Sequence, residues 1–279
     1  MTPYVEPSRR EGASPQPALA PRVTLENVSK DFHSHQGKLH VLDSVSLQIG
    51  AGEFFCLLGP SGCGKSTLFN IIAGLERPDS GQVLVDGRPV TGPGPDRVVV
   101  FQDGALFPWL TVRGNVEFGL AMRGLPRAAI RERAMAVLDL VRLSRFADAC
   151  IHELSGGMRQ RVSIARALAL EPRILLMDEP FAALDAQTRN VMQEELQRIW
   201  AQTGQTVIFV THNVAEAIRL GDRVAVLSFR PGQLKREVSI PNPRPRLSDD
   251  PRLLEIRTFI LRDLRADVHA AVEEELADE

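Results

Sequence analysis

Short stretches of β-forming residues, each bounded by turn residues, alternate with helical patterns along most of the chain. Several of these stretches are apolar throughout, as strands buried on both faces of a sheet should be. The alternation is typical of a largely parallel sheet with crossover helices, so we predict an α/β fold. The expected strands lie at residues 23–28, 54–58, 82–87, 97–102, 174–179, 206–211 and 223–229.

The middle of the chain has a helical pattern instead. Pro126 stands where a first helical turn tolerates proline, and apolar residues follow it at helical spacing. They are Ile130, Ala134, Val137, Leu138 and Val141. We therefore expect a helical lobe at about residues 103–160, inserted into the α/β domain.

The ends of the chain differ from this domain in composition. Residues 1–22 mix proline, serine and charge without an apolar core, so they are expected to form a disordered leader rather than a secretory signal. The α/β domain is expected to span residues 23–240. Residues 241–279 are expected to form a C-terminal helical extension.

Charge, apolar runs and cysteines exclude several classes of protein. The 33 basic and 35 acidic side chains leave a formal net charge of −2, which argues against a nucleic-acid partner. The apolar runs fall far short of the roughly 18 residues that span a bilayer. Cys56, Cys63 and Cys150 are too few and too scattered for a disulfide framework or a zinc site, so the sequence favours a reducing compartment.

Residues 59–66 read GPSGCGKS, which fits the G-x-x-x-x-G-K-[ST] pattern of a phosphate-binding loop, or P-loop. An expected strand precedes the loop and a helical pattern follows it, which argues against an ordinary glycine-rich turn. Glycines let the backbone approach phosphate, and free N–H groups at the helix start supply positive potential. The nucleotide-binding residues expected here are Gly59, Pro60, Ser61, Gly62, Cys63, Gly64, Lys65, Ser66 and Thr67.

Three of these side chains have their own expected roles. Lys65 reaches the β- and γ-phosphates, and the Ser66 hydroxyl ligates Mg²⁺. Cys63 occupies a variable position of the loop, where the local positive potential is expected to make its thiol unusually reactive. The P-loop alone leaves GTPases, kinases, helicases and ATP-driven machines open.

A pair of acids ends the apolar run at residues 174–179. Asp178 is expected at the carboxyl end of the sheet, where open α/β sheets bind ligands, and it can hold Mg²⁺ through water or through Ser66. Glu179 points differently and is a natural general base for the attacking water. Taken alone, the pair could equally be a solvated turn.

Residues 154–161 read LSGGMRQR, just ahead of the acidic strand. With this stretch, residues from about 23 to about 240 resemble the ATP-binding cassette (ABC) ATPases, whose signature motif it matches. The resemblance implies a RecA-like, mostly parallel sheet with an antiparallel β part and an inserted helical lobe. It also implies ATP hydrolysis by a head-to-tail homodimer. ATP is then held between the P-loop of one subunit and Ser155, Gly156 and Gly157 of the other.

The resemblance carries further residues over by position. Gln102 matches the glutamine that senses Mg²⁺ and the attacking water, and His212 matches the switch histidine at the γ-phosphate. Asp185 matches the D-loop, which communicates across the dimer. Phe32 matches the aromatic residue that stacks on adenine, although a phenylalanine in the core is the ordinary alternative. The expected catalytic residues are thus Glu179, His212, Gln102 and Lys65, and the expected Mg²⁺ ligands are Ser66, Gln102 and Asp178.

Longer stretches at residues 101–120, 177–185 and 211–234 resemble the ATP subunits of nitrate, sulfonate and taurine importers. That resemblance implies an integral membrane permease as partner, an extracytoplasmic solute-binding protein as indirect partner, and a place on the cytoplasmic face of the membrane. The alternative is a soluble ABC ATPase of repair, translation or cofactor assembly.

Two apolar segments each allow two interpretations. The loop at residues 105–110, with Trp109, either folds into the core of the helical lobe or receives a short helix from the permease. Residues 253–268 carry a helical apolar pattern that either packs on its own domain or binds a partner. Its members are Leu253, Ile256, Ile260, Leu264 and Val268.

Overall fold

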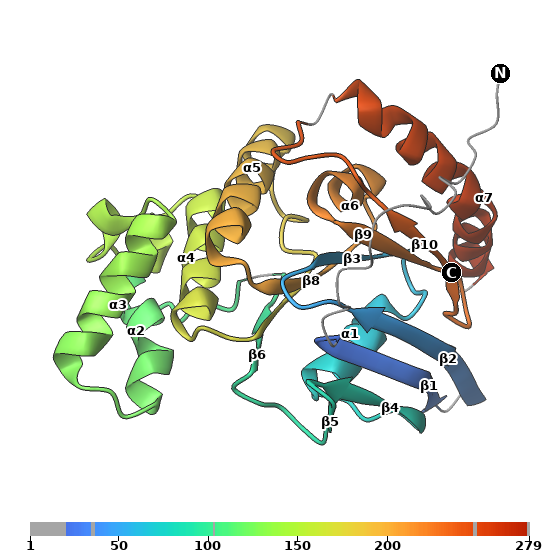
Figure 1. Ribbon diagram of the computed structural model, residues 1–279, viewed down its shortest axis with the longest axis horizontal. Helices are drawn as coiled ribbons and strands as arrows, with labels where there is room; N and C mark the ends of the chain where they lie inside the picture. The colour runs from blue at the N-terminus through green and yellow to red at the C-terminus, as the bar shows by residue number, and fades with distance from the viewer. Residues whose placement is uncertain (1–20, 35–36, 103, 248–249, 278–279) are drawn as a thin grey trace, which may run out of the picture.

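The computed structural model describes residues 21–34, 37–102, 104–247 and 250–277. Most of the expected leader at 1–22 therefore lies outside the described residues. A six-stranded sheet in the order β10-β9-β3-β8-β7-β6 forms the centre (Figure 1). Its members are β3 (Phe54–Leu58), β6 (Arg97–Val100), β7 (Ile174–Asp178), β8 (Thr206–Thr211), β9 (Arg223–Leu227) and β10 (Leu234–Ser239). All neighbours pair in parallel except β10, which is antiparallel to β9.

A second, antiparallel sheet has the strand order β2-β1-β4-β5. It contains β1 (Val23–Ser34), β2 (Gly37–Ile49), β4 (Ser80–Val85) and β5 (Arg88–Pro89). Each expected strand overlaps an observed one, whereas β2, β5 and β10 were not expected. Several ends differ as well. The first strand continues beyond residue 28 to Ser34, and the strands expected to reach residues 87, 102, 179 and 229 stop at Val85, Val100, Asp178 and Leu227.

The helices lie on both sides of the central sheet and in the lobe (Figure 1). Helix α1 (Lys65–Ala73) lies between the two sheets, and the lobe comprises α2, α3, the short 3-10 turns η1 and η2, and α4. Their bounds are α2 Val112–Met122, α3 Arg127–Leu140, η1 Ser144–Phe146, η2 Ile151–Glu153 and α4 Gly156–Ala169. The other face carries α5 (Ala186–Thr203), α6 (Val214–Leu220), the 3-10 turn η3 (Pro251–Leu253) and α7 (Leu254–Ala277).

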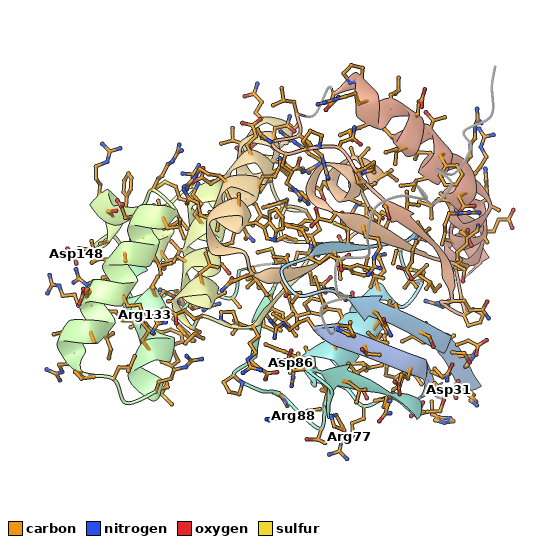
Figure 2. The ribbon with its side chains drawn as sticks, in the orientation of Figure 1. Asp31, Arg77, Asp86, Arg88, Arg133 and Asp148 are labelled. Atoms are coloured by element: carbon orange, nitrogen blue, oxygen red, sulfur yellow. The ribbon has the colours of Figure 1, made fainter. Side chains whose placement is uncertain are left out.

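Successive side chains of β3 point to opposite faces of the central sheet, so this strand contributes to two layers of the apolar core. Phe54, Cys56 and Leu58 pack with the lobe and with α5 to α7, while Phe55 and Leu57 pack with α1 and the antiparallel sheet. A strand buried on both faces has no polar side, which is why its sequence reads as an uninterrupted apolar run. Arg133 and Asp148 are among the charged residues on the lobe (Figure 2).

The C-terminal helix packs on its own domain. Leu253, Ile256, Ile260 and Leu264 are buried in the core, which decides between the two interpretations of this segment. Val268 shares the helical spacing but is not part of the buried set, because its side chain is 45% exposed. Among the described residues, no helix has both the length and the apolarity needed to cross a bilayer.

Arg246 joins the segment before α7 to the interior, with only 1% of its surface exposed. Its guanidinium donates hydrogen bonds to backbone carbonyls of Ile218, Gly221, Ile240 and Asn242, at 2.5 to 3.0 Å. Burial is the main cause that lowers the pKa of Arg246 to about 10, which leaves it charged at neutral pH. A buried charge is tolerated when its hydrogen-bonding groups are satisfied, as they are here by carbonyl dipoles.

Candidate active site

The P-loop connects β3 to α1 in a conformation that needs glycine. Gly62 and Gly64 have φ angles of 73° and 96°, in the left-handed region that L side chains rarely adopt. A Cβ on Gly64 would also lie 2.8 Å from Leu42 Cδ2 and 3.0 Å from the carbonyl oxygen of Val41. Gly64 caps α1 without a side-chain acceptor, so the first N–H groups of the helix remain available to a phosphate.

Lys65 begins α1 and is almost completely buried. Its ammonium donates to the carbonyl oxygens of Gly59 at 2.9 Å and Pro60 at 2.7 Å. The loop thus curls around the lysine side chain and holds its charge within the P-loop. An ammonium held this way can transfer its hydrogen bonds to phosphate oxygens.

A cavity of about 450 Å³ opens over the P-loop. It brings together most of the residues expected at the nucleotide: Ser61, Gly62, Gly64, Lys65, Ser66 and Thr67 of the P-loop, with Phe32, Gln102, Asp178 and Glu179. The expected residues Gly59, Pro60 and Cys63 are not among those that line it. Arg230 also lines this cavity and was not expected there. The SFRPG stretch that contains Arg230 belongs to the importer resemblance, but no site role was predicted for the arginine.

Asp178 and Glu179 leave the end of β7 in different environments. Burial, followed by the charge of Glu179, raises the pKa of Asp178, and a hydrogen bond with Ser66 opposes that shift. Asp178 is thus half-buried and bonded to Ser66. The alternative interpretation of these two acids as a solvated turn is wrong for Asp178. Glu179 has a φ of 42°, and its N–H donates to the carbonyl of Val210 at 3.0 Å.

His212 follows β8 directly and stands against Glu179. Its Nδ1 lies 3.0 Å from Glu179 Oε1. Two strand ends that are far apart in sequence therefore place a candidate base and a candidate switch histidine in contact. Gln102 lies beyond the end of β6, exposed and on the wall of the same cavity.

Phe32 lies where it was expected, at the nucleotide cavity, whereas Cys63 does not have the environment that was expected for it. Phe32 is 38% exposed and lines the cavity, with the Lys30 ammonium 5.3 Å from its ring centroid, so it is not a core residue. The prediction that the Cys63 thiol is unusually reactive is wrong. Its side chain is buried, and desolvation raises the pKa of its thiol more than the nearby Lys65 charge lowers it.

The signature residues occupy a different place. Ser155 caps α4 by accepting a hydrogen bond from the N–H of Met158 at 3.3 Å, and Gly157 packs closely on Thr188. Ser155 and Gly157 line a second cavity, of about 290 Å³, together with Gln187 and Thr188 at the start of α5. In the part of the chain that the structure describes, this cavity shares no lining residue with the P-loop cavity.

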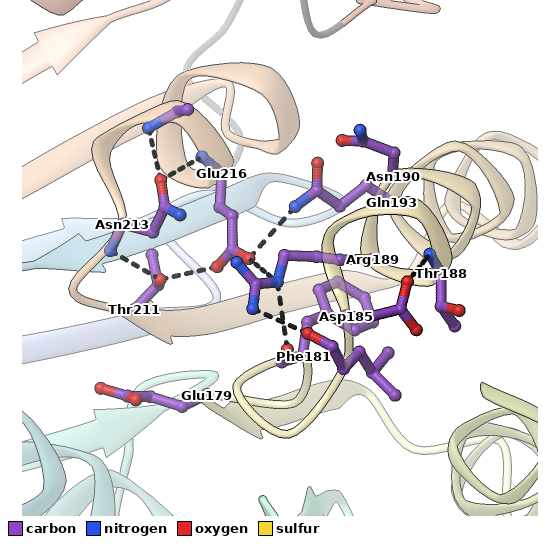
Figure 3. Close-up of polar contacts among 12 residues, drawn as sticks. Glu179, Phe181, Asp185, Thr188, Arg189, Asn190, Gln193, Thr211, Asn213 and Glu216 are labelled. Atoms are coloured by element: carbon purple, nitrogen blue, oxygen red, sulfur yellow. Dashed lines mark hydrogen bonds and ion pairs between the residues drawn. The ribbon is translucent and has the colours of Figure 1, made fainter. Parts of the chain in front are cut away.

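The D-loop precedes α5 and is held by that helix. Asp185 caps α5, accepting from the N–H groups of Gln187 and Thr188 at 3.0 Å each. Arg189, one turn later, donates to the carbonyls of Phe181 at 3.3 Å and Leu184 at 2.8 Å (Figure 3). The loop between Glu179 and α5 is thereby fixed at both ends.

A buried carboxylate links this loop to the residue that precedes His212. Glu216 Oε1 lies 3.7 Å from Arg189 Nε and accepts from Gln193 Nε2 at 3.1 Å, while its Oε2 accepts from the Thr211 hydroxyl at 2.8 Å (Figure 3). Thr211 immediately precedes His212. The sequence did not point to Arg189 or Glu216, because no linear motif joins two polar residues on separate helices.

Known proteins resemble this chain over most of its length. The family model described as ABC transporter matches residues 42–182. An uncharacterized ABC transporter ATP-binding protein of Methanocaldococcus jannaschii is 50% identical over 247 residues, which cover 88% of this chain and 92% of that protein. The chain belongs to the ABC transporter ATP-binding family. It is an ABC ATPase, as its P-loop and signature predicted.

Further relatives of this ABC ATPase carry more specific names. The taurine import ATP-binding protein TauB of Burkholderia pseudomallei is 47% identical over 251 residues, covering 87% of this chain and 96% of that protein. Among solved structures, a dimeric ATP-binding cassette in a post-hydrolysis state with ADP and Pi is 36% identical, with a TM-score of 0.68. The match covers 79% of this chain and 100% of that one. The ABC cassette fold is thereby confirmed.

Proposed function

We propose that this ABC ATPase energises the import of a small solute, such as taurine, another sulfonate or nitrate, through a membrane permease. The observation that supports this most is the 47% identity to taurine import subunits along nearly the whole chain. The subunit would then work on the cytoplasmic face of the membrane, with a solute-binding protein as an indirect partner.

Each residue of the site has a role in ATP hydrolysis under this proposal. Lys65 and the P-loop N–H groups hold the phosphates, Glu179 accepts the proton of the attacking water, and His212 orients that carboxylate. Ser66, Gln102 and Asp178 offer hydroxyl, amide and carboxylate oxygens, a donor set that suits Mg²⁺. When bound, Mg²⁺ would neutralise charge on the phosphate oxygens.

Two observations support a head-to-tail dimer. The signature and the P-loop lie in separate cavities of one chain, so one subunit cannot close both on the same nucleotide. A relative that is 36% identical has been solved as a dimeric cassette with ADP and Pi. We therefore propose that Ser155, Gly156 and Gly157 serve the nucleotide of the second subunit.

The permease surface is proposed on the lobe. Trp109 is 75% exposed, so the interpretation that buries it in the lobe core is wrong for this residue, although Leu106 does pack against the core. The Trp109 and Phe118 rings lie 5.4 Å and 4.5 Å from the Phe107 ring, and together these three form the lobe aromatic patch. Exposed aromatic clusters of this kind serve as anchors in protein interfaces.

Hydrogen bonds hold the backbone of the patch and connect the segment before it to α4. Buried Asn115 bonds the backbone N–H and C=O of Phe107, at 2.8 and 3.1 Å. Arg166 of α4 donates to the carbonyls of Gly104 and Ala105, just after Gln102, at 2.9 and 2.7 Å. Helix α4 also begins at the signature, which is proposed to contact the nucleotide of the second subunit. Movement of α4 would therefore change the position of the patch and the contact with that nucleotide together.

Trp109→Ala should leave the isolated subunit folded with nearly normal basal ATPase, because the side chain is exposed. Loss of an anchor typically costs about 2 kcal/mol or more, so the affinity for the permease should fall roughly 30-fold. Solute-stimulated hydrolysis, which requires that assembly, should fall as well. Thermal melting, basal ATPase and co-purification with the permease measure these outcomes. Leu261→Ala, an exposed apolar site on α7, is the matched control. Normal assembly of the Trp109 variant would remove the patch from the permease interface.

Deleting the gene should impair growth when taurine, another sulfonate or nitrate is the required sulfur or nitrogen source. Complementation with the wild-type gene should restore growth, and complementation with Lys65→Ala should not. Normal growth of the deletion strain on every such source would argue against this importer group. If the subunit were also absent from detergent-solubilised permease complexes, a soluble ABC ATPase of repair, translation or cofactor assembly would be favoured.

A further inference from the structure

Arg230 belongs to the hairpin that joins β9 to β10 and touches the P-loop directly. Its Nε donates to the carbonyl of Gly62 at 2.9 Å. A Cβ on Gly62 would lie 3.2 Å from Arg230 Nη2, so the guanidinium lies close against the glycine backbone. The side chain also lines the nucleotide cavity. A guanidinium placed beside a phosphate-binding loop adds a fixed charge and directed donors to the site.

The strand order fixes which end of the nucleotide Arg230 faces. In the central sheet β9 lies on one side of β3, while β8 and β7 lie on the other. The carboxyl ends of β7 and β8 carry Asp178, Glu179 and His212, which belong with the γ-phosphate. Arg230 follows β9 and therefore stands on the opposite side of the P-loop.

The antiparallel sheet reaches the same side. Gly232 of the hairpin donates to the Val41 carbonyl at 2.8 Å and accepts from the Asp43 N–H at 3.1 Å. Val41 and Phe32 both line the cavity, and Phe32 offers the aromatic face for adenine. Arg230 thus lies between the P-loop and the wall that receives the base, which is where the α-phosphate and ribose would lie.

The C-terminal helix holds this hairpin from behind. Asp267 of α7 accepts the backbone N–H of Phe229 at 2.9 Å, and its other oxygen pairs with the Lys235 ammonium at 2.6 Å. Lys235 also donates to the carbonyl of Asp263 at 2.6 Å. One carboxylate therefore ties both sides of the hairpin to α7, which runs along this edge of the domain (Figure 1).

We propose that Arg230 binds the α-phosphate and ribose end of the nucleotide, and that Asp267 positions it, so that the C-terminal helix sets nucleotide affinity. Arg230 is a further binding residue of this ATPase and Asp267 is a positioning residue. The contact is independent of the transported solute and of the permease.

Arg230→Ala should weaken the binding of ATP and of ADP by the same factor, about tenfold, because both nucleotides share the α-phosphate end. Binding is measured by titrating the isolated full-length subunit, at two salt concentrations. Arg230→Lys keeps the charge and should recover part of the affinity. A loss confined to ATP would place Arg230 at the γ-phosphate, and wild-type affinity for both nucleotides would remove it from the site.

Asp267→Asn tests the positioning role. It should raise the dissociation constants of ATP and ADP several-fold, and Arg230→Ala/Asp267→Asn should bind no more weakly than Arg230→Ala alone. Glu255→Gln removes the same charge from an exposed position of α7 and should change neither constant. Additive losses would mean that Asp267 acts by another route, and no loss in Asp267→Asn would overturn the positioning role. If Asp267→Asn lowers the melting temperature, Asp267→Glu serves as the second variant. It keeps the carboxylate and should recover the affinity for ATP and ADP.

Discussion

Glu179→Gln should bind ATP with nearly wild-type affinity but hydrolyse it at least about 10²-fold more slowly, a typical contribution of a general base. Glutamine keeps the size of the side chain and its reach toward His212, 3.0 Å away in the wild type, but cannot accept the proton of the attacking water. In the proposed head-to-tail dimer ATP holds the two subunits together, so slowing its hydrolysis should let a stable ATP-dependent dimer accumulate. Steady-state ATPase assays and size-exclusion chromatography with and without ATP measure the two effects.

Glu132→Gln, an exposed glutamate on α3, is the control for loss of a carboxylate and should hydrolyse ATP normally. His212→Ala should bind ATP and turn over slowly, since the partner that orients Glu179 is lost. Near-normal turnover of Glu179→Gln would exclude Glu179 as the base.

Ser155→Arg should abolish ATP-dependent dimerisation and the hydrolysis that requires it, while each monomer still binds ATP. The reason is that Ser155 lies in a cavity separate from the P-loop, and a long cation there blocks the surface offered to the other subunit. The sharpest measurement combines Ser155→Arg with Glu179→Gln. Sedimentation of this double variant with ATP should give monomer only, whereas Glu179→Gln alone should give dimer.

Ser144→Arg introduces the same side chain elsewhere on the lobe and should leave the dimer of Glu179→Gln intact. Nucleotide titration of the monomer separates the two models of the signature. Loss of ATP binding by the Ser155→Arg monomer would mean that the signature serves its own chain, contrary to the head-to-tail model.

The buried strands and the phosphate-binding residues could be predicted because their information is local. A strand such as β3 is apolar on both faces, and a P-loop requires glycines at fixed spacing. Strand β10 was missed because its sequence, LKREVS, is mostly exposed and resembles a polar loop. Strand β2 was missed as well. Its first four residues are exposed, although the alternation of buried and polar side chains from Val45 to Ile49 is itself a strand pattern.

The remaining errors concern contacts that only the folded chain creates. Arg189 and Glu216 meet because α5 and α6 pack side by side, and Arg230 reaches Gly62 because a hairpin folds back over the loop. The thiol of Cys63 looked reactive when only its neighbours in sequence were considered. Its burial depends on residues from other elements, which desolvate it more strongly than Lys65 stabilises the thiolate.

The position of Arg246 limits how this chain can be divided and recombined. Its guanidinium satisfies carbonyls at the end of α6 and beyond β10, so these segments have their partner in a residue closer to the C-terminus. A fusion joint placed after residue 240 would leave those carbonyls buried without a donor. The portable unit of this cassette therefore extends at least through Arg246, and any replacement for the segment that follows must still bury the apolar side of α7 in the core.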